Sequence, residues 1–375
     1  MEQTVAGADS LLCKYAGHDS DLSFYRAQSY IGSSKVPEQK PELKLEQKLK
    51  QEPEPQSPTV SLLDAETYEV EALQQRLVEL LAPMGGIARF VRSGDRVLLK
   101  PNLLTRSRPT KGCTTRPEIV YCVAKMVQAA GGKPFLGDSP AFGSAKGVAE
   151  ANGLMTWAKK ADVPIVEMHG KRYPIEGNEF DNFLLSKEAM EADVVINLPK
   201  LKSHVQLTMS MGVKNLFGCV PGKMKAWWHM EAGKDAQRFG TMLVETARAI
   251  SPELTIIDGI VGQEGNGPVN GEPRNLGILG ASDNVFALDR AIAEVLDIDP
   301  QVVPTLAQSI RLGLCPPVEE MMFPLRHPSE LTCTDWQLPE QMMPIDFGAP
   351  RVLRSTFKHL YIRFIKEPMA AYATR

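Results

Sequence analysis

Residues 192–204 read ADVVINLPKLKSH, an apolar run followed directly by a lysine-rich one. The first part, Asp193–Asn197, has the continuous apolar character of a strand that is buried on both faces, as in a parallel sheet. Lys200 and Lys202 come next, two residues apart, so in an extended chain their side chains would project the same way. The stretch therefore predicts a buried strand with basic residues after its C-terminal end.

The alternation of apolar strand and helix patterns continues on both sides of this stretch. Strands are predicted at Arg96–Leu99, Pro134–Leu136, Val163–Glu167, Asp193–Asn197, Leu254–Ile257 and Leu276–Leu279. Helices are predicted at Val70–Leu81, from Pro117 to the glycines at 131 and 132, and at Ser144–Asn152, Val205–Leu216, Phe239–Ile250 and Val285–Leu296. This order predicts an α/β layered fold with a mostly parallel sheet and flanking helices.

Composition divides the 375 residues into three parts. Residues 1–57 are rich in Lys, Glu, Gln and Pro and cannot bury enough apolar area to offset ordering, which predicts a disordered N-terminal extension. Residues 58–315 carry the strand–helix alternation and form the predicted α/β domain. Residues 316–375 have many prolines and no clear period, and we expect an irregular segment that ends in a basic helix at Val352–Ile365.

Several classes of protein are disfavoured by composition. The formal net charge of -3 argues against a nucleic-acid binder. No apolar run approaches the roughly 18 residues that cross a bilayer, and no signal-peptide pattern begins the chain, so we expect a cytoplasmic protein without membrane contact. The six cysteines form no C-x-x-C pair, so no disulfide framework and no local zinc or iron–sulfur loop is predicted.

The stretch Ile196–His229 contains five lysines and two histidines, but no aspartate or glutamate. Such a local excess of positive charge, placed after a buried strand, is suited to hold an anion. A solvated basic edge without a ligand would have the same composition, so both interpretations stay open.

Polar residues also follow the other predicted strands, and ligands of open α/β sheets bind outside the carboxyl ends of the strands. The loops expected there are Lys100–Asn102, Gly137–Pro140, Asn197–His204 and Asp258–Pro268. The glycine- and proline-rich residues 215–223 could add backbone N–H groups, although their spacing is not that of a Walker loop. The expected substrate-binding residues are Lys100, Asn102, Asp138, Ser139, Lys202, Lys214, Asn215 and Lys223.

The catalytic candidates are Lys200, His204, His229 and Asp258. A histidine has an unperturbed pKa near 6.5, which suits proton transfer, and crowding can lower a lysine pKa enough to make it a base or an imine former. Lysines beside Cys219 could lower the pKa of its thiol in the same way. No metal site is predicted, because the histidines lack the spacing of metal ligands.

Five segments together resemble the domain of unknown function family 362: RVLLKPNLL, AGGKPFLGDSPAFGSAKGV, ADVVINLPKLKSH, GVKNLFGCVPGKMKAWWH and IIDGIVGQEGNGPVNGEPRNLG. The resemblance covers roughly residues 59–314. It implies an α/β core that is often fused to a C-terminal ferredoxin segment, so that many members are described as iron–sulfur proteins. This chain has no C-x-x-C-x-x-C run, so any electrons would have to come from a separate partner.

Two functions follow as hypotheses. The first is an enzyme, with a redox link as one option, that acts on a small anionic metabolite at the lysine-rich site. The alternative is a non-catalytic docking partner of a separate ferredoxin or iron–sulfur protein. The sequence identifies no cofactor.

Overall fold

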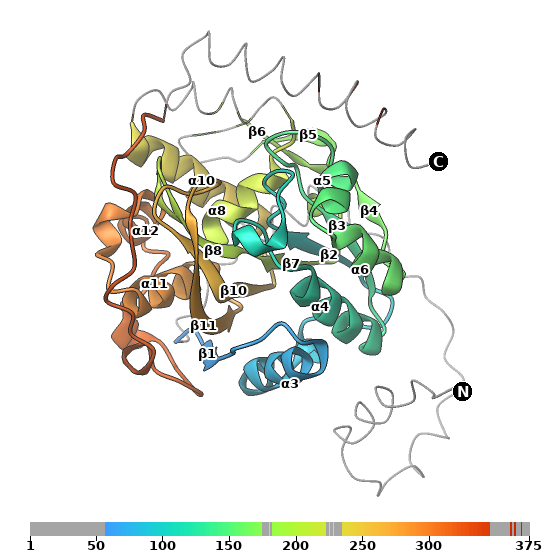
Figure 1. The fold of residues 1–375 in the computed structure, drawn as a ribbon, viewed down its shortest axis with the longest axis horizontal. Coiled ribbons are helices and arrows are strands. Elements are labelled where there is room, and N and C mark those ends of the chain that lie inside the picture. Colours follow the sequence, from blue (N-terminus) through green and yellow to red (C-terminus); the bar gives the residue numbers. More distant parts are fainter. Residues whose placement is uncertain are drawn as a thin grey trace, which may run out of the picture.

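The computed structural model describes residues 57–174, 180, 182–222, 225, 228, 235–345, 361, 364 and 369. These residues form a nine-stranded sheet with helices on both faces and a separate two-stranded ribbon (Figure 1). Five of the eight strand pairings in the large sheet are parallel. The predicted α/β fold with a mostly parallel sheet is confirmed. The N-terminal extension, except for Ser57, and most of the predicted helix Val352–Ile365 lie outside the described residues.

The strands of the large sheet run in the order β1-β11-β10-β7-β2-β3-β4, with β8 attached to β10 and β9 attached to β8. Their bounds are β1 (Val60–Asp64), β2 (Arg96–Pro101), β3 (Lys133–Gly137), β4 (Ile165–Val166), β7 (Val194–Leu198), β8 (Lys200–His204), β9 (Thr208–Ser210), β10 (Leu254–Glu264) and β11 (Glu272–Ser282). The ribbon consists of β5 (Gly170–Pro174) and β6 (Asn182–Ser186). Each predicted strand is present, and β10 and β11 are longer than the sequence indicated.

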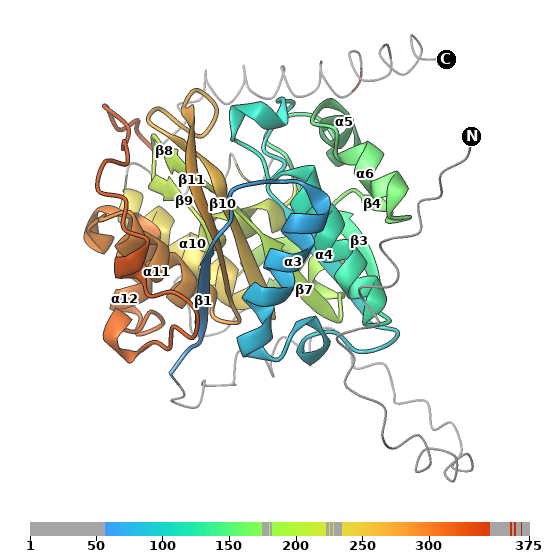
Figure 2. The same ribbon diagram turned by 60° about the horizontal axis from the view of Figure 1, so that its bottom comes forward.

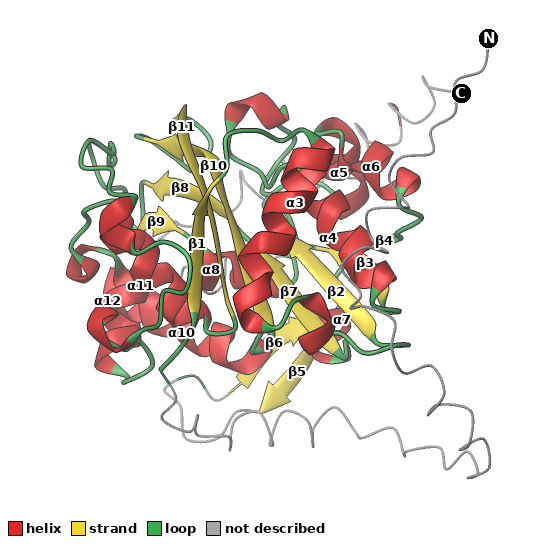
Figure 3. Ribbon diagram, turned by 90° about the horizontal axis from the view of Figure 1, so that it is seen from below, coloured by secondary structure: helices red, strands yellow, loops and turns green. Residues whose placement is uncertain are grey.

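Helices cover both faces of the sheet, as Figures 2 and 3 show. One face packs against α3 (Val70–Leu81), α4 (Pro117–Ala129), α5 (Ala145–Ala151) and α6 (Leu154–Lys160). The other packs against α8 (Gly212–Leu216), α10 (Ala236–Ile250), α11 (Val285–Val295) and α12 (Pro304–Arg311). The short α7 (Lys187–Met190) follows β6.

The side chains of β2 show how the sheet is buried on both sides. Val97 and Leu99 belong to the apolar cluster that contains α3 and α4, whereas Leu98 belongs to the cluster that contains α10. This alternation is the ordinary period of a strand. All five residues of β7 are buried as well, so the apolar run that begins the quoted stretch forms a central strand, as predicted.

The lysine-rich part of that stretch is also a strand. β7 ends at Leu198, Pro199 interrupts it, and β8 begins at Lys200, with both strands paired in parallel to β10. The prediction of a loop at Asn197–His204 is therefore wrong. Proline has no N–H to donate and breaks the hydrogen-bonding ladder for one residue only, after which the chain returns to the sheet. The extended conformation expected for Lys200 and Lys202 is confirmed.

The prediction of a loop beginning at Asp258 is also wrong, because this residue is paired with strands on both sides. β10 continues through Asp258 to Glu264, and β11 returns antiparallel to it from Glu272. Asp258 faces Leu279 of β11 on one side and Lys200 of β8 on the other. Partners on both sides satisfy the backbone groups of this glycine-containing segment, so it stays in the sheet.

The predicted helix Val205–Leu216 is much shorter in the structure. The chain turns after β8, forms β9 antiparallel to it, and becomes helical only at Gly212. Thr208 has a φ of 61°, a left-handed conformation that a helix cannot include. The first part of the prediction is therefore wrong, and the remaining helix α8 is the part that carries Lys214.

Residues 316–345 contain two short 3₁₀ helices, Val318–Glu320 and Pro328–Glu330. The segment first lies beside β1, where Met322 pairs with Thr59, and reaches β8 at Trp336. Trp336 is buried there and donates a hydrogen bond from its indole N–H to Ser203 Oγ at 3.0 Å. This contact fixes the segment against the strand that carries Lys200 and Lys202.

Within the described ranges, we find no helix with both the length and the apolar character needed to cross a membrane.

Candidate functional site

Five lysines gather near the C-terminal ends of the central parallel strands, and we call Lys100, Lys200, Lys202, Lys214 and Lys225 the lysine cluster. Lys100 lies on β2, Lys200 and Lys202 lie on β8, and Lys214 lies on α8. The first three are at most 1% exposed, and Lys214 and Lys225 are half-buried. Burial of this kind distinguishes the cluster from a solvated basic edge.

Lys100 is paired with Asp138, which directly follows β3. Lys100 Nζ and Asp138 Oδ1 are 2.8 Å apart, and Asp138 Oδ2 accepts a hydrogen bond from the Leu103 N–H at 2.9 Å. Gly218 makes room for this pair, because a Cβ atom there would collide with Asp138 Oδ1 and lie 2.5 Å from Lys100 Nζ. The ion pair therefore depends on a glycine that follows α8.

Two asparagine amides connect Lys100 to Lys202. Lys202 Nζ donates to Asn102 Oδ1 at 2.9 Å, Asn102 Nδ2 donates to Asn215 Oδ1 at 3.0 Å, and Lys100 Nζ donates to the same oxygen at 3.2 Å. Asn215 Nδ2 donates in turn to Asn197 Oδ1 at 2.8 Å. Residues of β2, β7, β8 and α8 are thus joined in one buried polar network.

The start of α8 is held by Asp289 of α11. Its two carboxylate oxygens accept hydrogen bonds from the Gly212 and Val213 N–H groups at 2.7 and 2.9 Å, and these are N–H groups that a helix cannot satisfy itself. Burial raises the pKa of Asp289 to about 7, against the two hydrogen bonds, which favour the carboxylate. This contact sets the position from which Lys214 and Asn215 project.

Lys200 belongs to a second group of contacts, centred on Asp258. Lys200 Nζ lies 2.8 Å from Asp258 Oδ2, and the Tyr68 hydroxyl donates to Asp258 Oδ1 at 2.7 Å. Lys200 Nζ donates to that same hydroxyl oxygen at 3.1 Å. Burial and then the charge of Asp258 raise the pKa of Tyr68 well above its ordinary value, so the hydroxyl keeps its proton. Burial lowers the pKa of Lys200, and the carboxylate of Asp258 opposes that change.

The cluster contains more positive than negative charge. In the described part of the chain, Asp138 and Asp258 are the carboxylates in ion-pair contact with it, against five lysines. Burial is the main cause that lowers the pKa of Lys202 and Lys214 to about 7 and that of Lys225 to about 8, and neighbouring lysines lower each of them further. An anion placed among these groups would raise their pKa values again, because a nearby negative charge favours the ammonium form.

Most residues predicted for the site do come together. The structure joins Lys100, Asn102, Asp138, Lys202 and Asn215 in one network, and Lys200 with Asp258 in the adjoining one. Ser139 contributes its backbone oxygen, which accepts a hydrogen bond from Lys225, while its hydroxyl oxygen accepts one from the Gly222 N–H.

The two predicted histidines have different outcomes. His204 is buried at the end of β8, and its Nδ1 accepts a hydrogen bond from the Gln206 N–H at 3.1 Å. Its catalytic role stays a prediction. His229 and Lys223 lie outside the described residues.

Sequence reasoning missed Tyr68, Arg116 and Asp289. The Arg116 N–H donates to Asp258 Oδ2 at 3.0 Å, and its guanidinium lies over the Tyr68 ring, 4.3 Å from the centroid. None of the three belongs to a charge run or a glycine-rich segment, so the sequence offered no signal beyond residue type.

Cys219 does not have the properties of a reactive thiol. Burial raises the pKa of Cys219 to about 12 despite the nearby lysines, so the expectation of a lowered pKa is wrong. Among the described residues, no three His, Cys, Asp or Glu side chains are placed to hold a metal ion. These residues do not fit an iron–sulfur cluster.

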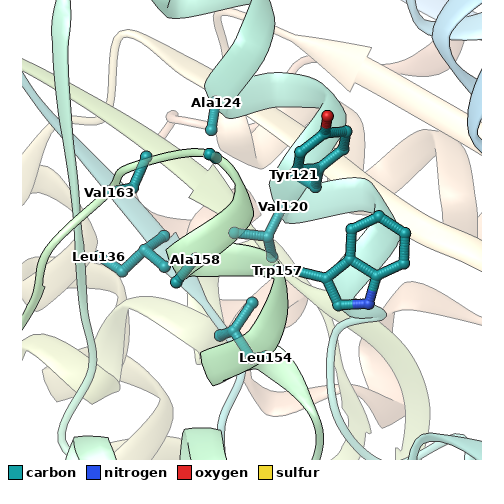
Figure 4. Close-up of a pocket in the computed structure, with 9 residues that line it drawn as sticks. Val120, Tyr121, Ala124, Leu136, Leu154, Trp157, Ala158 and Val163 are labelled. Atoms are coloured by element: carbon teal, nitrogen blue, oxygen red, sulfur yellow. The ribbon is translucent and has the colours of Figure 1, made fainter. Parts of the chain in front are cut away.

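A pocket between α4 and α6 is not related to this site. Figure 4 shows its apolar lining, which includes Val120 and Tyr121 of α4, Trp157 of α6 and Leu136 of β3. It lacks charged side chains and has the character of a packing defect, so it does not compete with the lysine cluster.

Comparisons with known proteins identify the family of this chain. The model of the DUF362 family, a domain of unknown function, matches residues 97–294. The thylakoid-associated protein sll1697 of Synechocystis sp. is 64% identical over 314 residues, which are 84% of this chain and 98% of that protein. The lactate racemase apoprotein from Thermoanaerobacterium thermosaccharolyticum has a TM-score of 0.41 and 12% identity, over 62% of this chain and 56% of its own, which is too weak to bear on function. On the family match and the close relative, the chain belongs to the DUF362 family.

Proposed function

We propose that this protein is an enzyme that binds a small anion with two or more negative charges in the lysine cluster. The observation that supports this most is the charge balance: of the five lysines, two have a carboxylate as an ion-pair partner among the described residues, Lys100 with Asp138 and Lys200 with Asp258. Burying a cation without a counter-charge costs several kcal/mol, so a fold that keeps this excess at its strand ends is expected to gain from an anionic ligand.

The two contact groups have separate roles in this proposal. Lys100 and Lys202 bind the anion, and Asn102 and Asn215 hold the two ammonium groups in place. Lys200 and Asp258 transfer protons, because their charged groups lie 2.8 Å apart, and Tyr68, which keeps its own proton, orients the carboxylate through a hydrogen bond at 2.7 Å.

We expect that an anion reaches Lys202 only when the segment that covers this lysine moves. Lys202 Nζ donates to the Cys113 carbonyl at 2.5 Å as well as to Asn102, so residues 102–116 close over this lysine. In this segment Gly112 has a φ of 66°, and a Cβ atom there would lie 2.9 Å from the carbonyl oxygen of Gly262. We expect the anion to replace the Cys113 carbonyl as the partner of Lys202.

The alternative of a docking face for a ferredoxin receives no support from the cluster. Lys100, Lys200 and Lys202 are buried, and a docking surface needs charges that the partner can reach. The proposed iron–sulfur association would have to use other residues.

The location of the protein is a separate proposal. The name of the relative from Synechocystis sp. describes it as thylakoid-associated, at 64% identity to this chain. We infer the same association here, and the cytoplasmic location stays a prediction. Fractionation of cells in low and high salt tests it: co-sedimentation with thylakoid membranes is expected, and recovery in the supernatant under both conditions would contradict it.

The anion is best tested by native mass spectrometry of freshly purified protein, followed by calorimetric titration with inorganic phosphate and citrate. Saturable binding is expected for the unaltered chain. Lys202→Gln should weaken it by about tenfold, which is about 1.4 kcal/mol, without loss of stability, because it removes a buried cation.

The matched control is Lys125→Gln on the exposed side of α4. It should bind phosphate and citrate as the unaltered chain does. Absence of saturable binding to both anions, or equal affinities of Lys202→Gln and the unaltered chain, would refute the proposed function.

A further inference from the structure

One lysine of the cluster differs from the other four in its contacts. Lys100 has Asp138 as its partner and Lys200 has Asp258. Lys202 and Lys225 donate to carbonyl oxygens of Cys113 and Ser139. Among the described residues, no oxygen accepts a hydrogen bond from Lys214, whose Nζ lies over the Phe217 ring, 4.9 Å from its centroid.

The surroundings of Lys214 favour its neutral form. Lys225 Nζ lies over the same ring at 5.8 Å, so the two amines are neighbours and the positive charge of one disfavours protonation of the other. Burial, followed by the charges of Lys225, Lys202 and Lys100, lowers the pKa of Lys214 to about 7. The charge of Asp138 opposes this change only weakly. A lysine beside other cations, with no carboxylate of the described residues in ion-pair contact with it, has the properties of an amine nucleophile.

We propose that Lys214 is the nucleophile of this site and forms an imine with the carbonyl carbon of a small anionic substrate. The inference rests on the proposed function, because the other lysines must bind the anionic group that brings the carbonyl to Lys214. It names the substrate class as small oxo acids or phosphorylated aldehydes and ketones.

The step balances without a redox partner. The neutral amine of Lys214 attacks the carbonyl carbon, a C–N bond forms, and the C–O bond breaks. The two amine hydrogens leave with the carbonyl oxygen as water. The resulting imine takes up a proton readily, and the proton-transferring group around Asp258 lies on the neighbouring strands.

α8 places the amine where such a substrate would lie. Asn215, the next residue, holds both the Lys100 ammonium and the Asn102 amide. An anionic group bound by Lys100 and Lys202 is therefore held by residues directly beside the nucleophile.

Pyridoxal 5′-phosphate is a suitable probe, because it carries an aldehyde and a phosphate. The protein is incubated with it, reduced with borohydride, digested and mapped by mass spectrometry. Labelling at Lys214 is expected to be roughly tenfold or more faster than at the exposed Lys125. Inorganic phosphate should slow it. The rate should level off above pH 8, whereas an ordinary lysine continues to gain reactivity to above pH 10.

Lys214→Arg replaces the amine by a guanidinium that cannot act as this nucleophile, so it should lose the selective labelling. Labelling spread evenly over exposed lysines, or a labelling rate at Lys214 that still rises above pH 9, would overturn the inference. If the unaltered chain still binds phosphate in that case, the proposed function stands. Absence of phosphate binding by the unaltered chain would overturn both. The pH profile is measured on the unaltered chain, so it decides the matter even if Lys214→Arg does not fold.

Discussion

At the scale of single residues, Gly218 shows how a small side chain determines the chemistry of charged ones. It lies where the Lys100–Asp138 pair approaches the backbone after α8, and its lack of a Cβ leaves room for both side chains. A glycine-rich turn was evident from the sequence, whereas its contact with an ion pair from two other strands was not. Lys100, Lys202 and Asn215 were predicted because they lie in basic or amide-rich runs that follow strands.

Gly218→Ala should disturb this pair directly. The new methyl group must displace Asp138 or Lys100, and overpacking of this kind costs about 1–3 kcal/mol of the free energy of unfolding. Denaturant unfolding and phosphate titration measure the two effects. Gly153→Ala is the control, because its φ of 82° is strained but its surroundings are open, so it should cost about 1 kcal/mol and leave anion binding unchanged. Equal behaviour of the two variants would show that Gly218 has no role beyond its backbone.

At the scale of secondary-structure elements, the sequence predicted where strands and helices lie better than where they end. Apolar periodicity identified α3, α4 and α11 because one face of each is buried. It failed at β8 and β10, where polar and glycine residues form strands because neighbouring strands supply their hydrogen bonds. Tyr68 and Asp258 are 190 residues apart in sequence, so a pattern within a short stretch of sequence cannot predict their hydrogen bond.

α8 provides the test at this scale, since Asp289 of α11 fixes its first turn. Asp289→Asn retains one acceptor oxygen for two N–H donors, so one N–H bond is lost at a cost of about 1–3 kcal/mol. We also expect weaker phosphate binding, because Lys214 and Asn215 project from this turn. Asp283→Asn, on the exposed side near the start of α11, should change neither property. Unaltered phosphate affinity in Asp289→Asn would mean that α8 is positioned by its other contacts.

At the scale of the whole molecule, the fold places an excess of buried positive charge where its central strands end. Apolar clusters on both faces of the sheet stabilise the chain, and the lysine cluster opposes that stabilisation. Free energy stored in this way is recovered when a counter-charge binds. Stability and ligand binding should therefore be linked through the protonation of the lysines.

The linkage predicts an unusual dependence of stability on pH. The pKa of Lys202 falls from 10.5 to about 7 on folding, so between these values the unfolded chain holds more protons than the native one. The free energy of unfolding should then rise with pH from about 7 to 9, by at most about 1.4 kcal/mol per pH unit from this group. Below pH 7 Lys202 is protonated in both the native and the unfolded chain, so its effect on stability no longer changes with pH. Urea unfolding at pH 7, 8 and 9 measures it.

Lys202→Met removes the titrating group, so its stability should change less with pH than that of the unaltered chain, while Lys125→Met should follow the unaltered chain. Saturating phosphate should also flatten the rise, because an anion beside Lys202 restores its pKa toward the ordinary value. Calorimetry in two buffers of different ionisation enthalpy should then show proton uptake on phosphate binding near pH 8. Parallel pH profiles for the unaltered chain and Lys202→Met would mean that the ammonium of Lys202 reaches solvent or a counter-charge in the free protein. The site would then lack the unfavourable electrostatic energy on which the proposed binding of an anion rests.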